Sequence, residues 1–172
     1  IIEITFRTTA AAAAIERIRK SFPEIILGAG TIINKEQAKH AINIGVNFGV
    51  APGLNPEIVK YFQENNVLFI PGVMTTSEIE KGLESGCQIL KFFPAESSGG
   101  IATLKTLAGP YNSHNIKYVP TGGLNHQKMA EYLCSPMVCS VGGSWLATKE
   151  QIKKNLWIEI ETQIQSTLNK LV

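Results

Sequence analysis

Three charged residues lie inside segments that otherwise have the composition of buried β-strands. In residues 1–7, IIEITFR, the alternation of a strand places Glu3 and Arg7 on one face and apolar residues on the other. Lys91 interrupts the apolar run QILKFFP at residues 88–94 in a similar way. Burial favours the neutral form of a lysine, and a neutral amine can form a Schiff base with a carbonyl compound. A purely structural ion pair between Lys91 and Glu3 would explain the same pattern.

Two glycine-rich turns indicate a second kind of chemistry, the binding of an anion. Thr121-Gly122-Gly123 follows one apolar run, and Gly142-Gly143-Ser144-Trp145 follows the next. Backbone N–H groups at such turns and at helix N-termini bind phosphate. Tight turns also use glycine for steric reasons alone. Two such turns in a chain that also buries a lysine favour a phosphate site.

The elements that must position these residues repeat along the chain. Short apolar runs end at a glycine or proline and are followed by segments with helical spacing of apolar residues. The runs start about 20 to 28 residues apart, the length of a βα unit, so parallel strands with helical crossovers are predicted. The predicted strands are residues 1–6, 24–30, 47–52, 67–72, 88–94, 116–120 and 138–143, and the predicted N-caps are Asn34, Asn55, Thr75 or Thr76, and Asn125.

This repeat predicts an α/β fold, and specifically a (β/α)₈ TIM barrel. Gly28-Ala29-Gly30 lacks the rest of a dinucleotide or P-loop motif, which disfavours the open sheet. Only seven units are found where the barrel needs eight, so we expect the first strand to be absent from this chain. One domain is predicted over 1–172, with a C-terminal helix at about 149–171. Prolines would end strands at the active-site rim, at Pro52, Pro71, Pro94 and Pro120.

Composition excludes several classes of function. The 172 residues are 44% hydrophobic and 17% charged with a net charge of +2, which disfavours disorder and a strongly electrostatic nucleic-acid or membrane binder. No apolar stretch approaches the roughly 20 residues of a membrane span. Cys87, Cys134 and Cys139 form no C-x-x-C pair, and no histidines are spaced as ligands, so no metal is expected. Free thiols predict a reducing cytoplasm.

Six short strings resemble the 2-keto-3-deoxy-6-phosphogluconate (KDPG) aldolase family, also described as 4-hydroxy-2-oxoglutarate aldolase. They are EITFRT (3–8), GAGT (28–31), APGL (51–54), LKFFPAE (90–96), PTGG (120–123) and GGSWL (142–146). The resemblance implies a homotrimer of (β/α)₈ barrels that needs no metal or other cofactor. It also implies a phosphorylated keto acid as substrate and a place in the Entner–Doudoroff pathway. The resemblance also implies that a leading helix and the first strand of the family are absent from this chain. Ala51 departs from the family pattern, where serine is frequent.

The resemblance implies a role for each matching residue. Lys91 would form the Schiff base, and Glu3 would donate and accept protons. The pyruvate part of the substrate would contact Arg7, Thr31 and Thr121, with Pro52 and Phe93 packed around it, and the phosphate would contact Gly122, Gly123, Gly143 and Ser144.

The predicted reaction is class I aldol cleavage of KDPG to pyruvate and glyceraldehyde 3-phosphate. Cleavage of 4-hydroxy-2-oxoglutarate to pyruvate and glyoxylate is a second predicted activity. Three alternatives remain open on the sequence alone. They are an aldolase for the 6-phosphogalactonate epimer, a phosphate-binding barrel isomerase, and a non-catalytic barrel remnant that serves as a binding module.

Overall fold

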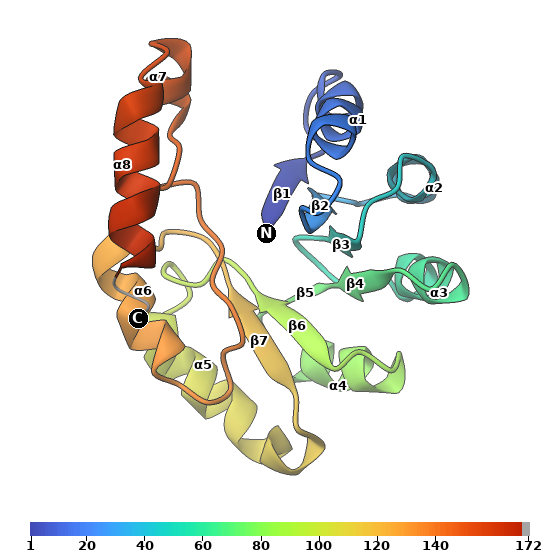
Figure 1. Cartoon of the computed structure of the whole chain (residues 1–172). Helices are drawn as coiled ribbons and strands as arrows, with labels where there is room; N and C mark the ends of the chain where they lie inside the picture. The colour runs from blue at the N-terminus through green and yellow to red at the C-terminus, as the bar shows by residue number, and fades with distance from the viewer. Residues whose placement is uncertain (170–172) are drawn as a thin grey trace. The chain divides into compact units, whose positions relative to one another are not determined.

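The computed structural model describes residues 1–169 and divides into two compact units, one of residues 1–93 and one from residue 94 onward. Strands and helices alternate along the first unit (Figure 1). Its elements are β1 (Ile2–Thr5), α1 (Ala11–Ser21), β2 (Leu27–Gly30), α2 (Lys35–Asn43), β3 (Phe48–Val50), α3 (Pro56–Glu64), β4 (Leu68–Ile70), β5 (Gly72–Val73), α4 (Thr76–Glu84) and β6 (Ile89–Phe92).

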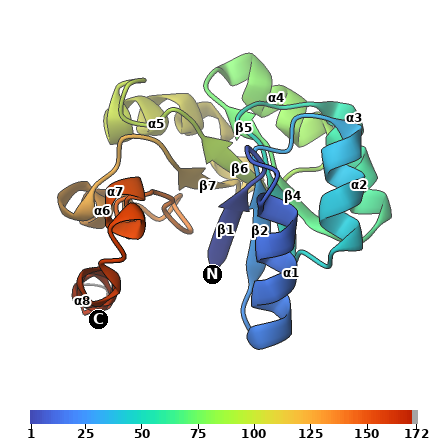
Figure 2. The same cartoon turned by 90° about the horizontal axis from the view of Figure 1, so that it is seen from above.

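The strands of the first unit pair in parallel, as the repeat predicts. Strands β1 to β4 form a sheet in chain order, and β5 pairs with β6. Helices α1, α2 and α3 lie along one side of the four-stranded sheet (Figures 1 and 2). Fully buried residues such as Ile15, Leu27 and Phe62 fill the space between the sheet and these helices. The alternation of strand and helix therefore follows from apolar faces that bury against one another.

Helix starts follow the predicted N-caps. Asn34 accepts a hydrogen bond from the N–H of Gln37, and Asn55 accepts one from the N–H of Glu57. Thr75 forms a capping box with Glu78, which selects Thr75 over Thr76 as the cap of α4. In the second unit Asn125 caps its helix in the same manner. All four caps are confirmed.

Pro71 divides the run that the sequence predicts as one strand at 67–72. The structure has β4 before Pro71 and β5 after it, and the two strands belong to different sheets. Proline has no N–H to donate to a ladder, so the pairing with β3 cannot continue through it. Its carbonyl still accepts a hydrogen bond of 2.8 Å from the N–H of Lys91.

The second unit contains one regular strand, β7, among its described residues. Its elements are α5 (Gly100–Ala108), the 3₁₀ segment η1 (Gly109–His114), β7 (Lys117–Pro120), α6 (His126–Leu133), α7 (Lys149–Lys153) and α8 (Trp157–Leu168). The strand predicted at 138–143 is wrong, because only the single bridges Tyr118↔Val138 and Thr121↔Gly142 form there. Cys139 and Ser140 are exposed and two glycines follow, so this segment has little apolar surface to hold it in a sheet.

The predicted C-terminal helix at 149–171 is two helices in the structure. Helix α7 ends at Lys153, and α8 begins at Trp157. Asn155 adopts the left-handed conformation with φ of 54°, which ends a helix, and asparagine tolerates it better than most residues. Residues 170 and 171 of the prediction lie outside the described residues. No helix within 1–169 is long and apolar enough to span a bilayer.

Candidate active site

Lys91 is a buried lysine at the centre of the first unit's candidate site. Strand β6 carries it, and the residue is only 7% exposed. Removal from water lowers the pKa of the Lys91 ammonium below its usual 10.5, the negative charge of Glu3 opposes that shift, and the positive charge of Arg7 adds to it. The Nζ atom lies 4.8 Å from the centre of the Phe93 ring. The amine is thus held in apolar surroundings with more of its neutral form than an exposed lysine has.

Glu3 is positioned by β1 and by the absence of a side chain on β2. Its Cα partner across the parallel ladder is Gly28, and its carboxylate extends over Gly30. A Cβ atom at Gly30 would overlap that carboxylate. The sequence places Glu3 and Arg7 in a segment with the composition of a buried strand, but the structure leaves both side chains exposed. Strand β1 lies at the edge of its four-stranded sheet, so its side chains have a neighbouring strand on one side only.

Thr31 directly follows β2 in a strained conformation. Its φ is 62°, and a β-branched residue rarely adopts positive φ because its side chain crowds the backbone. Strain of this kind persists where the surroundings fix it, and it is typical of functional sites. The backbone around Thr31 is indeed fixed, since the N–H of Ile32 donates to the carbonyl of Val50 at 3.0 Å.

Gln37 fixes the loops that carry Arg7 and Thr31, and the sequence analysis missed it. Its side-chain oxygen accepts from the N–H of Ile33 at 2.9 Å, and its side-chain nitrogen donates to the carbonyl of Phe6 at 3.3 Å. The residue lies three positions after the Asn34 cap and donates its own N–H to that side chain. A glutamine at this position is also part of an ordinary cap pattern, so spacing alone did not distinguish it.

Pro52 begins an exposed turn after β3, and this turn packs against β5. A Cβ atom at Gly72 would overlap the carbonyl of Pro52, and the N–H of Gly72 donates to the carbonyl of Gly53 at 3.1 Å. The turn after β3 is therefore tied to the strand that pairs with β6. Gly72 is the Cα partner of Lys91 in that pairing.

In the second unit the structure brings the two glycine-rich turns together. Gly122 and Gly123 have φ of 102° and 78°, a conformation that glycine adopts without strain. The N–H of Gly142 donates to the carbonyl of Pro120 at 3.0 Å. A Cβ atom at Gly142 would lie 2.8 Å from the Thr121 hydroxyl oxygen. The second turn therefore lies directly beside the first.

The conformation around Ser144 is fixed by contacts of its two neighbours, Gly143 and Trp145. Gly143 packs against the Trp145 ring so closely that a Cβ atom at Gly143 would overlap it. The side chain of Gln163 on α8 donates to the carbonyl of Trp145. Gly143 and Ser144 are both exposed. Helix α8 and the tryptophan thus hold the turn while its surface stays open to a ligand.

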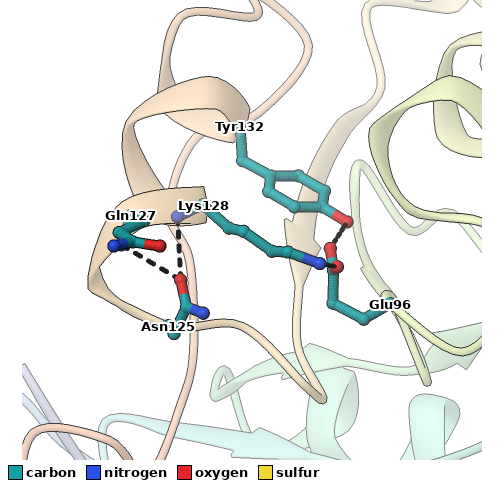
Figure 3. Close-up of polar contacts among 5 residues, drawn as sticks. All are labelled: Glu96, Asn125, Gln127, Lys128 and Tyr132. Atoms are coloured by element: carbon teal, nitrogen blue, oxygen red, sulfur yellow. Dashed lines mark hydrogen bonds and ion pairs between the residues drawn. The ribbon is translucent and has the colours of Figure 1, made fainter.

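Glu96 forms a polar network that the sequence analysis also missed. Its carboxylate accepts a hydrogen bond of 2.7 Å from the Tyr132 hydroxyl and pairs with the Lys128 ammonium, and both partners come from α6 (Figure 3). Hydrogen bonds from Lys128 and Tyr132 lower the pKa of Glu96, while burial is the main cause that raises the pKa of Tyr132. Glu96 ends the string LKFFPAE, but its partners lie more than 30 residues away, so no local pattern revealed them.

The predicted site residues therefore form two groups, one in each unit. In the first unit the charges of Glu3 and Arg7 shift the pKa of Lys91, and the Lys91 amine lies over the Phe93 ring. The glycine turns and Thr121 gather in the second unit. Within residues 1–169, no three histidine, cysteine, aspartate or glutamate residues cluster in a way that could hold a metal ion.

Comparison with known proteins adds a family match over almost the whole chain. The family described as KDPG and KHG aldolase matches residues 1–163. The 2-dehydro-3-deoxy-phosphogluconate aldolase of Treponema pallidum is 41% identical over 167 residues, which are 97% of this chain and 79% of that protein.

Solved structures agree with the sequence match. KDPG aldolase from Legionella pneumophila, with pyruvate captured at low pH as a covalent carbinolamine, is 38% identical with a TM-score of 0.91 over 96% of this chain and 79% of that one. The Zymomonas mobilis enzyme with 3-phosphoglycerate is 35% identical with a TM-score of 0.80 over 86% of this chain and 69% of that one. These matches and the parallel βα units confirm the predicted fold class, an α/β fold of the (β/α)-barrel type.

Proposed function

The chain belongs to the KDPG and KHG aldolase family, and from this premise we propose that it cleaves KDPG through a Schiff base on Lys91. The products are pyruvate and glyceraldehyde 3-phosphate, which makes the protein an aldehyde-lyase. The observation that supports the proposal most directly is the burial of the Lys91 amine, which lowers its pKa. A lysine in this environment is prepared for nucleophilic attack on a ketone.

In the first half of the reaction the Lys91 amine attacks C2 of the substrate, and loss of water gives an iminium ion. Glu3, directly or through a water molecule, takes the proton of the C4 hydroxyl. The C3–C4 bond then breaks, its electron pair moves toward the iminium nitrogen to give an enamine, and glyceraldehyde 3-phosphate leaves. Proton transfer of this kind contributes about 10² to 10⁴ in rate.

In the second half the proton held by Glu3 returns to C3 of the enamine. The iminium ion that forms is hydrolysed, which releases pyruvate and restores the neutral Lys91 amine.

The remaining site residues have binding roles in this proposal. The planar guanidinium of Arg7 pairs with the substrate carboxylate, and its charge also lowers the pKa of Lys91. Thr31 and Thr121 bind the pyruvate part by their hydroxyls, with Pro52 and Phe93 packed around it. The phosphate is bound by the turns of the second unit, through Gly122, Gly123, Gly143 and Ser144.

The decisive experiment traps the covalent intermediate. We expect borohydride to reduce the imine that pyruvate forms, and mass spectrometry of the digest to place the adduct on Lys91. Lys91→Met should abolish both labelling and cleavage. Lys117→Met is the matched control, because Lys117 also lies in a strand but is exposed, and it should label like the wild type. An adduct on another lysine, or none, would overturn the mechanism.

The substrate range follows from the shared pyruvate half. 4-Hydroxy-2-oxoglutarate presents the same ketone and carboxylate to Lys91 and Arg7 but has no phosphate, so we propose that it is cleaved less efficiently. Comparison of kcat/KM for the two substrates measures the phosphate contribution, and the 6-phosphogalactonate epimer tests the stereochemistry at C4.

We also propose a cytoplasmic homotrimer. Trp157 and Ile158 of α8 are 57% and 81% exposed, which supports burial of this helix against another subunit. The free thiols of Cys87, Cys134 and Cys139 support a reducing compartment. Sedimentation equilibrium should give three times the chain mass, and a monomer at micromolar concentration would exclude the trimer. Cell fractionation tests the location.

A further inference from the structure

Glu96 contacts the Thr121–Gly123 turn through its backbone and helix α6 through its side chain. The N–H of Glu96 donates to the carbonyl of Gly122 at 3.0 Å, and the N–H of Ala95 donates to the carbonyl of Thr121 at 2.8 Å. A Cβ atom at Gly123 would lie 2.7 Å from the Cβ of Glu96. The turn therefore packs directly on this residue, and Glu96 forms one wall of it.

The side chain of Glu96 contacts helix α6, which follows directly after the same turn. Its carboxylate is held by Lys128 and Tyr132, and α6 begins just after Gly123, where Asn125 caps it (Figure 3). The chain thus runs from the turn into α6, and the side chains of α6 return to Glu96. The turn is therefore held by the backbone and Cβ of Glu96 on one side and continues into helix α6 on the other.

We propose that Glu96, held by Lys128 and Tyr132, is a positioning residue for phosphate binding, because it fixes the Gly122–Gly123 turn in the conformation that presents its N–H groups. This inference rests on the proposed function, which assigns the phosphate to that turn. Two consecutive glycines at positive φ have wide conformational freedom, so the turn needs external support to keep one geometry. Prearranged donors bind more tightly because less ordering occurs when the ligand arrives.

Charge alone would not place a carboxylate here. A glutamate beside a phosphate site repels the ligand, and the pairing with Lys128 offsets that repulsion. Positioning and electrostatics therefore predict opposite effects when Glu96 is neutralised. Loss of support weakens the binding of the phosphorylated substrate, whereas loss of repulsion alone strengthens it. The sign of the effect distinguishes the two.

Tyr132→Phe is the sharpest test, since it removes one hydrogen bond to Glu96 without changing charge or shape. Its matched control is Tyr118→Phe, because Tyr118 is as buried a residue as Tyr132 but its hydroxyl has no hydrogen-bond partner among the described residues. Glu96→Gln and Glu96→Ala form a second pair, in which the amide retains part of the network. Glu150→Gln, which breaks the exposed pair with Lys154, controls for loss of an ion pair in the same unit.

For Tyr132→Phe we expect KM for KDPG to rise about fivefold to tenfold, with kcat little changed. The effect is smaller than loss of a direct hydrogen bond to a charged ligand, because the lost bond acts on the phosphate only through Glu96. The dissociation constant of inorganic phosphate, measured by calorimetry, should rise by a similar factor. KM for 4-hydroxy-2-oxoglutarate should stay within about twofold of the wild-type value, because the substitution does not affect the binding of a substrate without phosphate. Glu96→Ala should show the larger effect, and Glu96→Gln an intermediate one.

Equal losses on both substrates would overturn the proposal, since they indicate a general structural role. Tighter binding of phosphate by Glu96→Gln would also overturn it, since repulsion would then dominate. If the wild type forms no pyruvate adduct on Lys91, the proposed function fails, but the phosphate titrations still test Glu96. If Glu96→Ala does not fold, Tyr132→Phe carries the test alone.

Discussion

Lys91 and the Thr121–Gly123 turn belong to different units and are prepared for their roles by different physical means. Lys91 is an ionisable side chain that burial removes from water, and two exposed charges then adjust its pKa. The turn has no ionisable side chain, and its properties come from the backbone angles of two glycines and from the Glu96 network. Covalent chemistry here depends on desolvation, whereas anion binding depends on backbone conformation.

The two regions should therefore respond differently to substitution. A buried ammonium opposes folding, so the first unit carries an electrostatic penalty that a neutral side chain would remove. The turn carries a conformational penalty, because glycine loses more backbone entropy on folding than other residues. The following experiments test this contrast, from the largest expected effect to the smallest.

Lys91→Met should abolish turnover and stabilise the fold by about 1 kcal/mol, a gain typical of relieving a functional residue. Because the folded-state pKa of Lys91 lies below the ordinary 10.5, the unfolded chain binds more protons between the two pKa values. Wild-type stability thus rises with pH through that window, and the advantage of the variant should fade as pH approaches 10.5. Urea unfolding across pH measures this, and an advantage independent of pH would break the electrostatic account.

Glu3→Gln should lower kcat by about 10² to 10⁴, while the pyruvate adduct on Lys91 still forms. Glu3 raises the pKa of Lys91, so its removal should lower that pKa further and let trapping persist to lower pH. Trapping yield against pH and steady-state kinetics give the two readouts. Glu24→Gln, an exposed glutamate before β2, should change neither. Loss of labelling in Glu3→Gln would show that Glu3 is needed for imine formation itself.

Ser144→Ala should weaken use of KDPG by about 10-fold to 100-fold through KM, because a hydrogen bond to a charged group contributes about 1.5 to 3 kcal/mol. Cleavage of 4-hydroxy-2-oxoglutarate should be nearly unchanged. Ser140→Ala provides an exposed serine from the same segment as a control. An equal loss on both substrates would mean that Ser144 binds the pyruvate part of the substrate and not the phosphate. The proposed division between covalent chemistry in the first unit and phosphate binding in the second would then fail.

Thr31→Gly should stabilise the fold by about 1 kcal/mol, because it relieves a β-branched residue held at φ of 62°. Turnover should fall a few-fold as the hydroxyl and the fixed backbone are lost. Asn66→Gly, at φ of 55°, should stabilise less, since asparagine tolerates this conformation. Thermal unfolding and kcat/KM measure both, and destabilisation by Thr31→Gly would show that Thr31 is not strained.

Local sequence patterns were sufficient where one segment determines the structure. Alternation of apolar residues identified β1 and β6, and with them Glu3 and Lys91, and side-chain chemistry identified the caps at Asn34 and Asn125. Patterns failed where the outcome depends on a distant partner. The run at 138–143 looks like a strand but makes only single bridges.

The missed residues have the same explanation. Glu96 is separated from Tyr132 by 36 positions, and Gln37 from Phe6 by 31. The ionisation of a buried lysine follows from the type of residue and its strand. The support of a backbone turn follows from which loops and helices meet, and this information is not present in any short window.

Gly30 has a consequence for laboratory evolution of this protein. Any side chain there would occupy the space of the Glu3 carboxylate, so a mutation at position 30 acts as a hidden mutation at position 3. Under selection for turnover, a library randomised at position 30 should return glycine. Under selection for folding alone in a Glu3→Ala background, other residues should be accepted at position 30. The two positions are therefore epistatic and must be varied together.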